Sequence, residues 1–366
     1  MGSGRAAAVT DLFTRGPVTT FLQLARTGEL RARTVADPAR RSDHSEQTRL
    51  EVLRLLVTAC GAEDYADLPP QINPQSKPVV ATRPRTLFRS QLTTLADQAG
   101  APRGRVRMLA MGAVVCDTGL RAGELCARTV EDLAPTLEEL RVVRRPQGWS
   151  ESEAYTELLP LSGLSRAALR RWLPERHDLL TAVGGTATAL WVSLKPNHHG
   201  GRAVPAGTPL EPRGLAREWT RAVDDTNGQL AGEPSWEPLP RRMEQLRRGV
   251  TPKGTAAPMQ ADAERAAVLL DAVAARARAL AALHREGETD STAGLQARIE
   301  VRQAVREAWA EGIEHAVQLS VLAEAGLPDT ASLAAAGWEP VLLAAIERDR
   351  GWGRPSKAAT AQASHT

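Results

Sequence analysis

The sequence has few of the residues that mark secreted, membrane-spanning or metal-binding proteins. It contains three cysteines, an odd number with no metal-ligand spacing, which favours a reducing compartment. Cys116 and Cys126 fall in apolar helical patterns and are expected to be buried thiols. No apolar run approaches the roughly eighteen residues of a membrane span, and the first residues lead into no stretch of signal-peptide type. These absences predict a cytoplasmic protein without cofactor or metal. The pair His198-His199 has no evident third ligand.

Aromatic residues and lysines are also scarce. Aromatics make up 4% of the 366 residues, with only two tyrosines, and lysine stands only at positions 77, 195, 253 and 357. The net charge is +3 and the isoelectric point about 9.0. With only four lysines among the 46 lysine and arginine residues, the cations are overwhelmingly arginine. Arginine can bind phosphate with two parallel donors, although a high-GC coding bias would also enrich it. The arginines form pairs at 40–41, 144–145, 170–171, 241–242 and 247–248.

Prolines and apolar periodicity divide the chain into segments. Residues 15–68 are predicted to form a small helical domain, and the proline-rich stretch 69–82 a linker. A larger domain is expected over 83–258, a helical C-terminal region over 259–350, and a disordered tail over 351–366.

Secondary structure is expected to be mainly helical with a small β-hairpin. The hairpin is predicted from strands at 140–144 and 156–161, and a further short strand at 189–194. Residues 195–212 and 228–240 are expected to be irregular. Helices are predicted at 86–99, 108–116 with an end near Gly119, 164–173, 215–223, 261–285, 295–312, 316–325, 330–336 and 341–346.

One short stretch carries most of the functional information. An apolar helix stops at Thr118-Gly119, and Arg121 stands at the start of the next helix. Glycine permits the sharp turn, and an arginine beside a helix N-terminus is a good place for a phosphate. On spacing alone, the plainer interpretation is a helix–turn–helix joint with one surface arginine.

This stretch resembles the first signature box of the tyrosine recombinase, or phage integrase, family. The matching residues are Thr118, Gly119, Leu120, Arg121, Glu124, Leu125 and Asp132. The resemblance covers about residues 15 to 255 and implies a core-binding domain, a linker and a catalytic-type domain, here with a helical C-terminal extension. By the resemblance, Arg121 is the first catalytic arginine, and Glu124 supports it.

The family's second box, His-x-Leu-Arg, has a weaker counterpart at 244–247. Arg247 fits the second arginine, but Glu244 stands where the histidine belongs. The alternative is a basic surface helix. The family also places a lysine in the hairpin, where this chain has Arg144, Arg145 and Gln147. Contacts to the DNA backbone are predicted for Arg144, Arg145, Arg241, Arg242, Arg248 and Lys253.

The nucleophile of the recombinase reaction is missing from its expected place. Two arginines neutralise the charge on the scissile phosphate while a tyrosine attacks it, and in the family that tyrosine follows the second arginine. Here Tyr65 and Tyr155 both precede Arg247 and are expected to be packing residues. His284 and His315, which do follow it, lie in alanine-rich helical settings. Whether the chain is an enzyme is therefore uncertain, and the missing nucleophile favours a protein without catalytic activity.

The C-terminal third allows two interpretations. Residues 305–313, 319–327 and 330–336 resemble a helix-turn-helix module, but the last helix has no side chain suited to reading bases. The alternative is a helical bundle that packs on the preceding domain or on another protomer. Residues 351–357 resemble an AT-hook that lacks its first arginine.

The sequence favours a DNA-binding protein involved in DNA recombination or integration, in a phage or mobile element. Its expected role is that of a catalytically degenerate accessory or regulatory relative of recombinases. Double-stranded DNA is the expected partner, together with a second copy of the chain or a partner recombinase, and no membrane. One alternative is an active recombinase with an unplaced nucleophile, and another is a helical protein-interaction scaffold or transcriptional regulator.

Overall fold

The chain forms two compact units, Met1–Pro78 and Val79–Thr366. The computed structural model describes residues 9–27, 29–30, 43–63, 67–69, 90, 100–144, 154–185, 187–199, 202–234, 236–250, 253–258 and 260–349. Most of the predicted linker, the predicted helix 86–99 and the tail 351–366 lie outside these residues, as do Tyr65, Arg145 and Gln147.

The first unit is a helical pair. A 3-10 turn η1 (Val9–Phe13) precedes α1 (Arg15–Thr27), and α2 (Asp43–Ala59) follows. In α1, Val18, Leu22 and Ala25 are spaced by four and three residues, so they share one buried face. Val18 and Leu22 pack with Leu50 of α2 in a small core. The prediction of helices in this part of the chain is confirmed.

The second unit is built on α4 (Arg103–Thr118), which is buried along most of its length. It ends at Gly119, whose φ of 63° is left-handed and whose N–H donates to Val115 O at 2.9 Å. Alongside it packs α6 (Gly163–Val183), opened by Ser162 as N-cap. The predicted end of α6 at residue 173 is wrong: the helix runs through Pro174, and buried Leu179 and Leu180 hold the added turns in the core.

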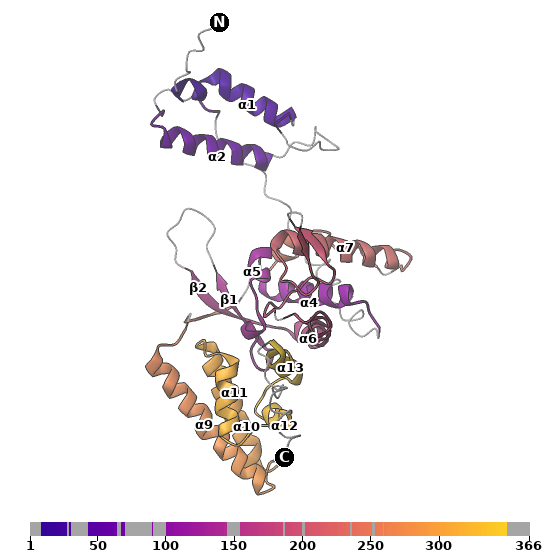
Figure 1. Ribbon diagram of the computed structural model, residues 1–366, viewed down its shortest axis with the longest axis vertical. Coiled ribbons are helices and arrows are strands. Elements are labelled where there is room, and N and C mark those ends of the chain that lie inside the picture. The colour runs from indigo at the N-terminus through magenta and orange to yellow at the C-terminus, as the bar shows by residue number, and fades with distance from the viewer. Residues whose placement is uncertain are drawn as a thin grey trace, which may run out of the picture. The chain divides into compact units, whose positions relative to one another are not determined.

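A three-stranded antiparallel sheet of strand order β1-β2-β5 lies beside these helices (Figure 1). Strand β1 is Glu139–Arg144, β2 is Tyr155–Pro160 and β5 is Thr255–Ala257. The predicted hairpin is thus confirmed, whereas the third strand was not predicted. The register pairs Leu140 with Leu159, Val142 with Glu157 and Arg144 with Tyr155. Because side chains alternate along a strand, these six share one face.

Three other predictions are corrected by the structure. Residues 189–194 form single bridges at Ala189 and Val192 rather than a strand. The expected loop 195–212 contains a short hairpin, β3 (Asn197–His199) and β4 (Arg202–Val204). The helix predicted at 215–223 is α7 (Pro212–Leu230), which begins with proline in its first turn and continues through Gly228 into the expected irregular stretch.

The C-terminal helices share the core of the second unit. They are α9 (Ala263–Arg285), α10 (Thr292–Ala310), α11 (His315–Glu324), α12 (Thr330–Ala335) and α13 (Pro340–Asp349), close to the predicted ranges. Helices α9 and α10 form a long antiparallel pair, and α13 packs on α6 (Figure 1). Trp309 of α10 donates from Nε1 to Glu131 O at 3.1 Å. The bundle therefore packs on the preceding part of its own chain.

The structure does not favour the helix-turn-helix interpretation, in which α12 would be the helix that reads DNA bases. This helix is six residues long, with Ser332 and Leu333 buried, and Ala336 beyond it is buried too. A recognition helix must present side chains to base edges, and α12 exposes only Thr330 and Ala331 fully.

Candidate functional site

The first signature stretch folds into a tight turn that ends at Arg121. Gly119 closes α4, and Arg121 is the extended N-cap residue of α5 (Ala122–Cys126). The carboxylate of Glu124 accepts the backbone N–H of Arg121 at 2.8 Å. The carboxylate of Glu124 thus already lies at the N-terminus of its own helix, where a phosphate would bind. With only five residues, α5 is also too short to attract an anion by its dipole. Any attraction for phosphate at this turn must therefore come from arginine side chains.

The second signature stretch lies against the first. It forms α8 (Met243–Arg247), which packs on α4. Val250, just beyond α8, lies against Gly119, so that a methyl group added to this glycine would be 3.5 Å from the Val250 side chain. A residue other than glycine would also be strained at this φ. A distance of 3.5 Å is an ordinary van der Waals contact, so the left-handed φ, and not the closeness of Val250, is what favours glycine at this turn.

Arg144 connects the turn to the sheet. Its Nη1 donates to Glu124 Oε2 at 3.0 Å and its Nε to Glu157 Oε2 at 2.9 Å, while Nη2 reaches Thr118 O at 3.2 Å. The three charged side chains are only 12% to 17% exposed. Arg144 was predicted as a DNA contact, yet all three of its guanidinium nitrogens are engaged within the protein.

Arg247 is held in a two-pronged ion pair with Glu244. Its Nε and Nη2 donate to the two Glu244 carboxylate oxygens at 2.8 and 2.6 Å, and Arg248 Nε reaches the same carboxylate at 3.2 Å. The hydrogen bond from Arg247 holds the pKa of Glu244 down at about 2. The same bond raises the pKa of Arg247, and the nearby charge of Glu124 adds to that rise. The interaction with Glu124 places Arg247 beside the first signature stretch.

Arg121 differs from its neighbours. It is half-buried, yet within the described residues its guanidinium makes neither a hydrogen bond nor an ion pair. The cluster formed by Arg121, Arg144, Arg247 and Arg248 carries four positive charges against those of Glu124, Glu157 and Glu244. One positive charge is left over, and Arg121 is the side chain with open donors.

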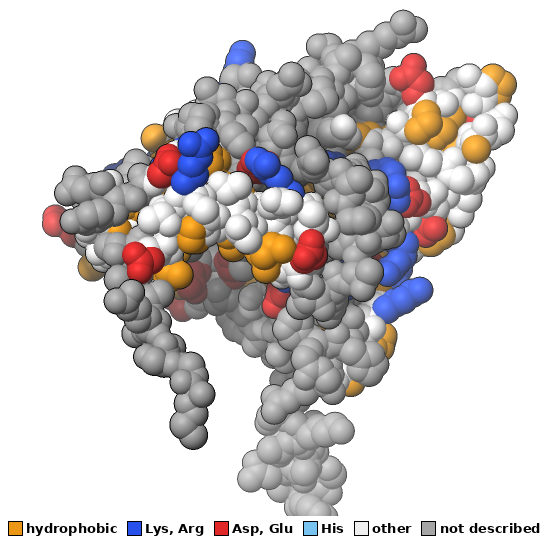
Figure 2. Space-filling model, turned by 90° about the horizontal axis from the view of Figure 1, so that it is seen from above, with side chains coloured by type: hydrophobic (Ala, Val, Ile, Leu, Met, Phe, Trp, Pro, Cys, Tyr) orange, Lys and Arg blue, Asp and Glu red, His pale blue; other side chains and the backbone are white. Residues whose placement is uncertain are grey.

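The other predicted DNA contacts are more exposed. Arg241 pairs with Asp224 of α7 at 2.8 Å with 69% of its side chain exposed. Arg242 and Lys253 are exposed at the two ends of the α8 segment. Figure 2 shows basic and acidic side chains next to each other on the coloured part of one face, with hydrophobic side chains between them.

Tyr155 is not a packing residue, so this expectation is wrong. It stands opposite Arg144 at the outer end of the hairpin and is 53% exposed. The face that it shares passes from buried Leu140 and Leu159 to half-buried Arg144 and Glu157, and then to Tyr155. His315, one of the two histidines that follow Arg247, is fully buried in the C-terminal bundle, where its Nε2 lies 2.9 Å from Leu133 O. Of Tyr155 and His315, only Tyr155 lies on the face that carries Arg144.

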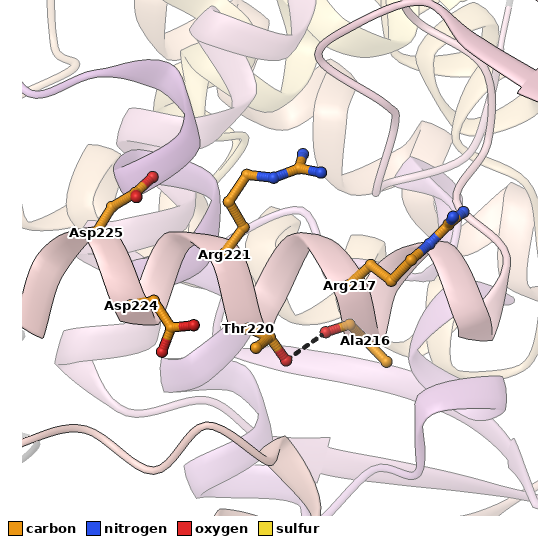
Figure 3. A pocket seen from close by; sticks show the side chains of 6 residues that line it. All are labelled: Ala216, Arg217, Thr220, Arg221, Asp224 and Asp225. Atoms are coloured by element: carbon orange, nitrogen blue, oxygen red, sulfur yellow. Dashed lines mark hydrogen bonds between the residues drawn. The ribbon is translucent and has the colours of Figure 1, made fainter. Parts of the chain in front are cut away.

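A row of arginines on α7 was missed. Arg213, Arg217 and Arg221 are all exposed, and their four-residue spacing puts them on one side of the helix, which packs against α5. The signal was present in the sequence, but the shorter predicted helix left Arg213 outside it. Figure 3 shows Arg217 and Arg221 along an open hollow whose described lining comes from α7 alone. One wall does not define a ligand site.

Other kinds of site are not indicated in the described part of the chain. Its residues contain no group of three or more histidine, cysteine, aspartate or glutamate side chains arranged to hold a metal ion. The side chains of His198 and His199 lie outside that description. Among the described helices, none is both long and apolar enough to cross a bilayer.

Comparisons with solved structures give a weak structural likeness. The chain matches no protein-family model and no curated protein. A solved structure, described as the crystal structure of XerA recombinase, is similar over 66% of this chain and 68% of that chain. The sequence identity is 16% and the TM-score 0.29. A TM-score of this size does not establish a shared fold, and the candidate site stands on its own residues.

Proposed function

We propose that this protein binds duplex DNA through the cluster of Arg121, Arg247 and Arg248, in a role connected with DNA recombination or integration. The observation that carries the proposal is the open guanidinium of Arg121 in a cluster that also contains Arg247. Two arginines beside one site are suited to a phosphate, because each can offer parallel N–H donors to its oxygens. Arg144 supports the site by holding Glu124 and Glu157 rather than by touching DNA.

The surrounding cations extend the contact along the backbone. Arg241, Arg242 and Lys253, together with Arg145 outside the described residues, would bind neighbouring phosphates, and the arginine row of α7 would add to them. Such contacts position a protein on DNA without reading sequence. The proposal places the protein in the cytoplasm, with a second copy or a partner recombinase as its protein partner.

A catalytically degenerate role fits the residues that the site contains. A transesterification at phosphorus needs a nucleophile and a proton donor for the leaving oxygen. At the position of the family's histidine, Glu244 is ionised and engaged by two arginines. An ionised carboxylate accepts hydrogen bonds but cannot donate a proton.

Salt-dependent binding tests the proposal. The affinity for a short duplex of arbitrary sequence, followed by fluorescence anisotropy, should fall steeply between about 50 and 200 mM salt. Arg121→Ala should weaken binding and lower the slope of log affinity against log salt by about one. Arg103→Ala is the matched control, since Arg103 pairs with Glu175 at the opposite end of α4. Native affinity that barely changes with salt would contradict the proposal.

The second candidate function is that of an active recombinase. It is favoured by Tyr155, which is exposed on the sheet face that carries Arg144. This phenol is the group that could form a covalent bond to the phosphorus atom and release a deoxyribose hydroxyl. A nicked suicide duplex separates the two functions, because cleavage would trap the protein on DNA. We expect no adduct. An adduct that is lost in both Tyr155→Phe and Arg121→Ala would establish the second candidate.

A further inference from the structure

The most exposed side chain among Glu244, Arg247 and Arg248 is the carboxylate. Glu244 is 39% exposed, whereas the Arg247 and Arg248 side chains that it binds are 26% and 25% exposed. The acid is therefore the more accessible member of the group.

The bond to Arg247 uses the donors that a phosphate would need. Nε and one Nη of an arginine point in parallel and match two oxygens of a carboxylate or a phosphate. In Arg247 these two donors are taken by Glu244, and Arg248 gives its own Nε to the same carboxylate. On this edge of the guanidinium, a phosphate can form the two-pronged contact only after the carboxylate leaves.

We infer that Glu244 is an internal competitor that occupies the phosphate-binding edge of Arg247 and Arg248 until a DNA backbone displaces it. The inference rests on the proposed function and goes beyond it by assigning a role to the residue in the histidine position. Glu244 regulates access to the site, and it selects against ligands that engage the two arginines alone.

The exchange is feasible because solvent reaches this ion pair. It lies within one short helix, at three- and four-residue spacing, and all its members are partly exposed. Pairs of this kind contribute little to stability. Glu124, by contrast, is fixed by Arg144 and by the backbone of Arg121. Glu244 is therefore the carboxylate of the cluster that can move away.

The competition favours extended polyanions over single phosphates. An isolated phosphate must displace Glu244 with the energy of one contact, whereas a DNA backbone also binds Arg121 and the surrounding cations. Because the pKa of Glu244 is about 2, the carboxylate stays charged through the neutral range. The displacement of Glu244 therefore depends on which anion binds, and not on pH in the neutral range.

Glu244→Gln tests the inference in the full chain by duplex binding at several salt concentrations. Glutamine keeps the size of the side chain but removes its charge, so it should release the two donors of Arg247 for phosphate. We expect affinity to rise about 5- to 10-fold at moderate salt and the salt slope to steepen by about one. Glu175→Gln is the matched control, a carboxylate paired with Arg103 at the far end of α4, and should bind as the native protein does.

A further set of variants distinguishes competition between Glu244 and phosphate from a general effect of removing one negative charge. In the double variant Arg247→Ala, Arg248→Ala, adding Glu244→Gln should no longer raise the affinity for DNA. The arginine donors that Glu244 binds are then absent, so there is nothing for the substitution to release. A gain that persists there, or an unchanged salt slope in the single variant, would overturn the inference. The proposed function fails separately, if native binding is insensitive both to salt and to Arg121→Ala.

Discussion

Replacing Arg144 with alanine would remove the side chain that connects the first signature turn to the sheet. Its guanidinium binds Glu124, Glu157 and the carbonyl of Thr118 at 2.9 to 3.2 Å. After the substitution, two carboxylates that are 12% and 17% exposed would face each other without a cation. The fold would therefore keep two partly desolvated charges that no longer have their shared partner.

The expected cost follows from that burial. Removing one partner of a buried ion pair costs about 3 to 5 kcal/mol, most of it the penalty for the charge left behind. Because these carboxylates retain some solvent contact, and Glu124 keeps the Arg121 N–H, we expect the lower end, about 3 kcal/mol. For a unit that spans Val79–Thr366, with an unfolding entropy of about 2.1 cal/mol/K per residue, that corresponds to a fall in melting temperature of about 5 °C.

Thermal unfolding followed by circular dichroism measures this effect, and a triple variant tests its cause. If unpaired charge is the origin, then adding Glu124→Gln and Glu157→Gln to Arg144→Ala should restore most of the lost stability. An Arg144→Ala protein that melts at the native temperature would refute the positioning role. Arg144 would then be free to serve as the DNA contact that the sequence predicts.

Two further predictions concern the rest of the second unit. Asp349→Ala should lower the free energy of unfolding by about 3 kcal/mol, because it leaves the fully buried Arg176 guanidinium with only the carbonyls of Ala187 and Ala189; an unchanged melting temperature would show that α13 is held by apolar packing alone. Labelling with a thiol reagent at pH 8 should modify exposed Cys60 rapidly and Cys116 and Cys126 only after unfolding, because Cys116 is buried and burial raises the pKa of Cys126 to about 12; fast reaction of a second thiol in the folded protein would contradict this.

Features set by nearby residues were predictable from the sequence. The end of α4 follows from Thr118-Gly119, since glycine readily adopts the left-handed conformation of a helix C-terminus. The hairpin follows from two apolar alternations, and its register brings together Leu140 and Leu159, which the core requires. The association of Arg121 with Glu124 is local too, because the two are three residues apart.

Features set by distant partners were not predictable. Strand β5 has three residues and exists because β2 offers a free edge for it. Helix α6 passes through Pro174 because apolar side chains on both sides of that residue are buried together. The partners of Arg144 come from the first signature stretch and from β2, both far from it in the sequence, so no spacing rule could distinguish a structural arginine from a DNA contact.

Glu244 stands where the recombinase family, which the sequence resembles, has a histidine, and the two side chains would give such a site different properties. A neutral or cationic imidazole beside two arginines leaves their donors open and can itself donate a proton. A carboxylate at the same position closes those donors and has no proton to give at a pKa of about 2. In the function that we propose, Glu244 therefore has two roles: it provides no proton for strand cleavage, and it favours ligands large enough to reach Arg121 as well as Arg247.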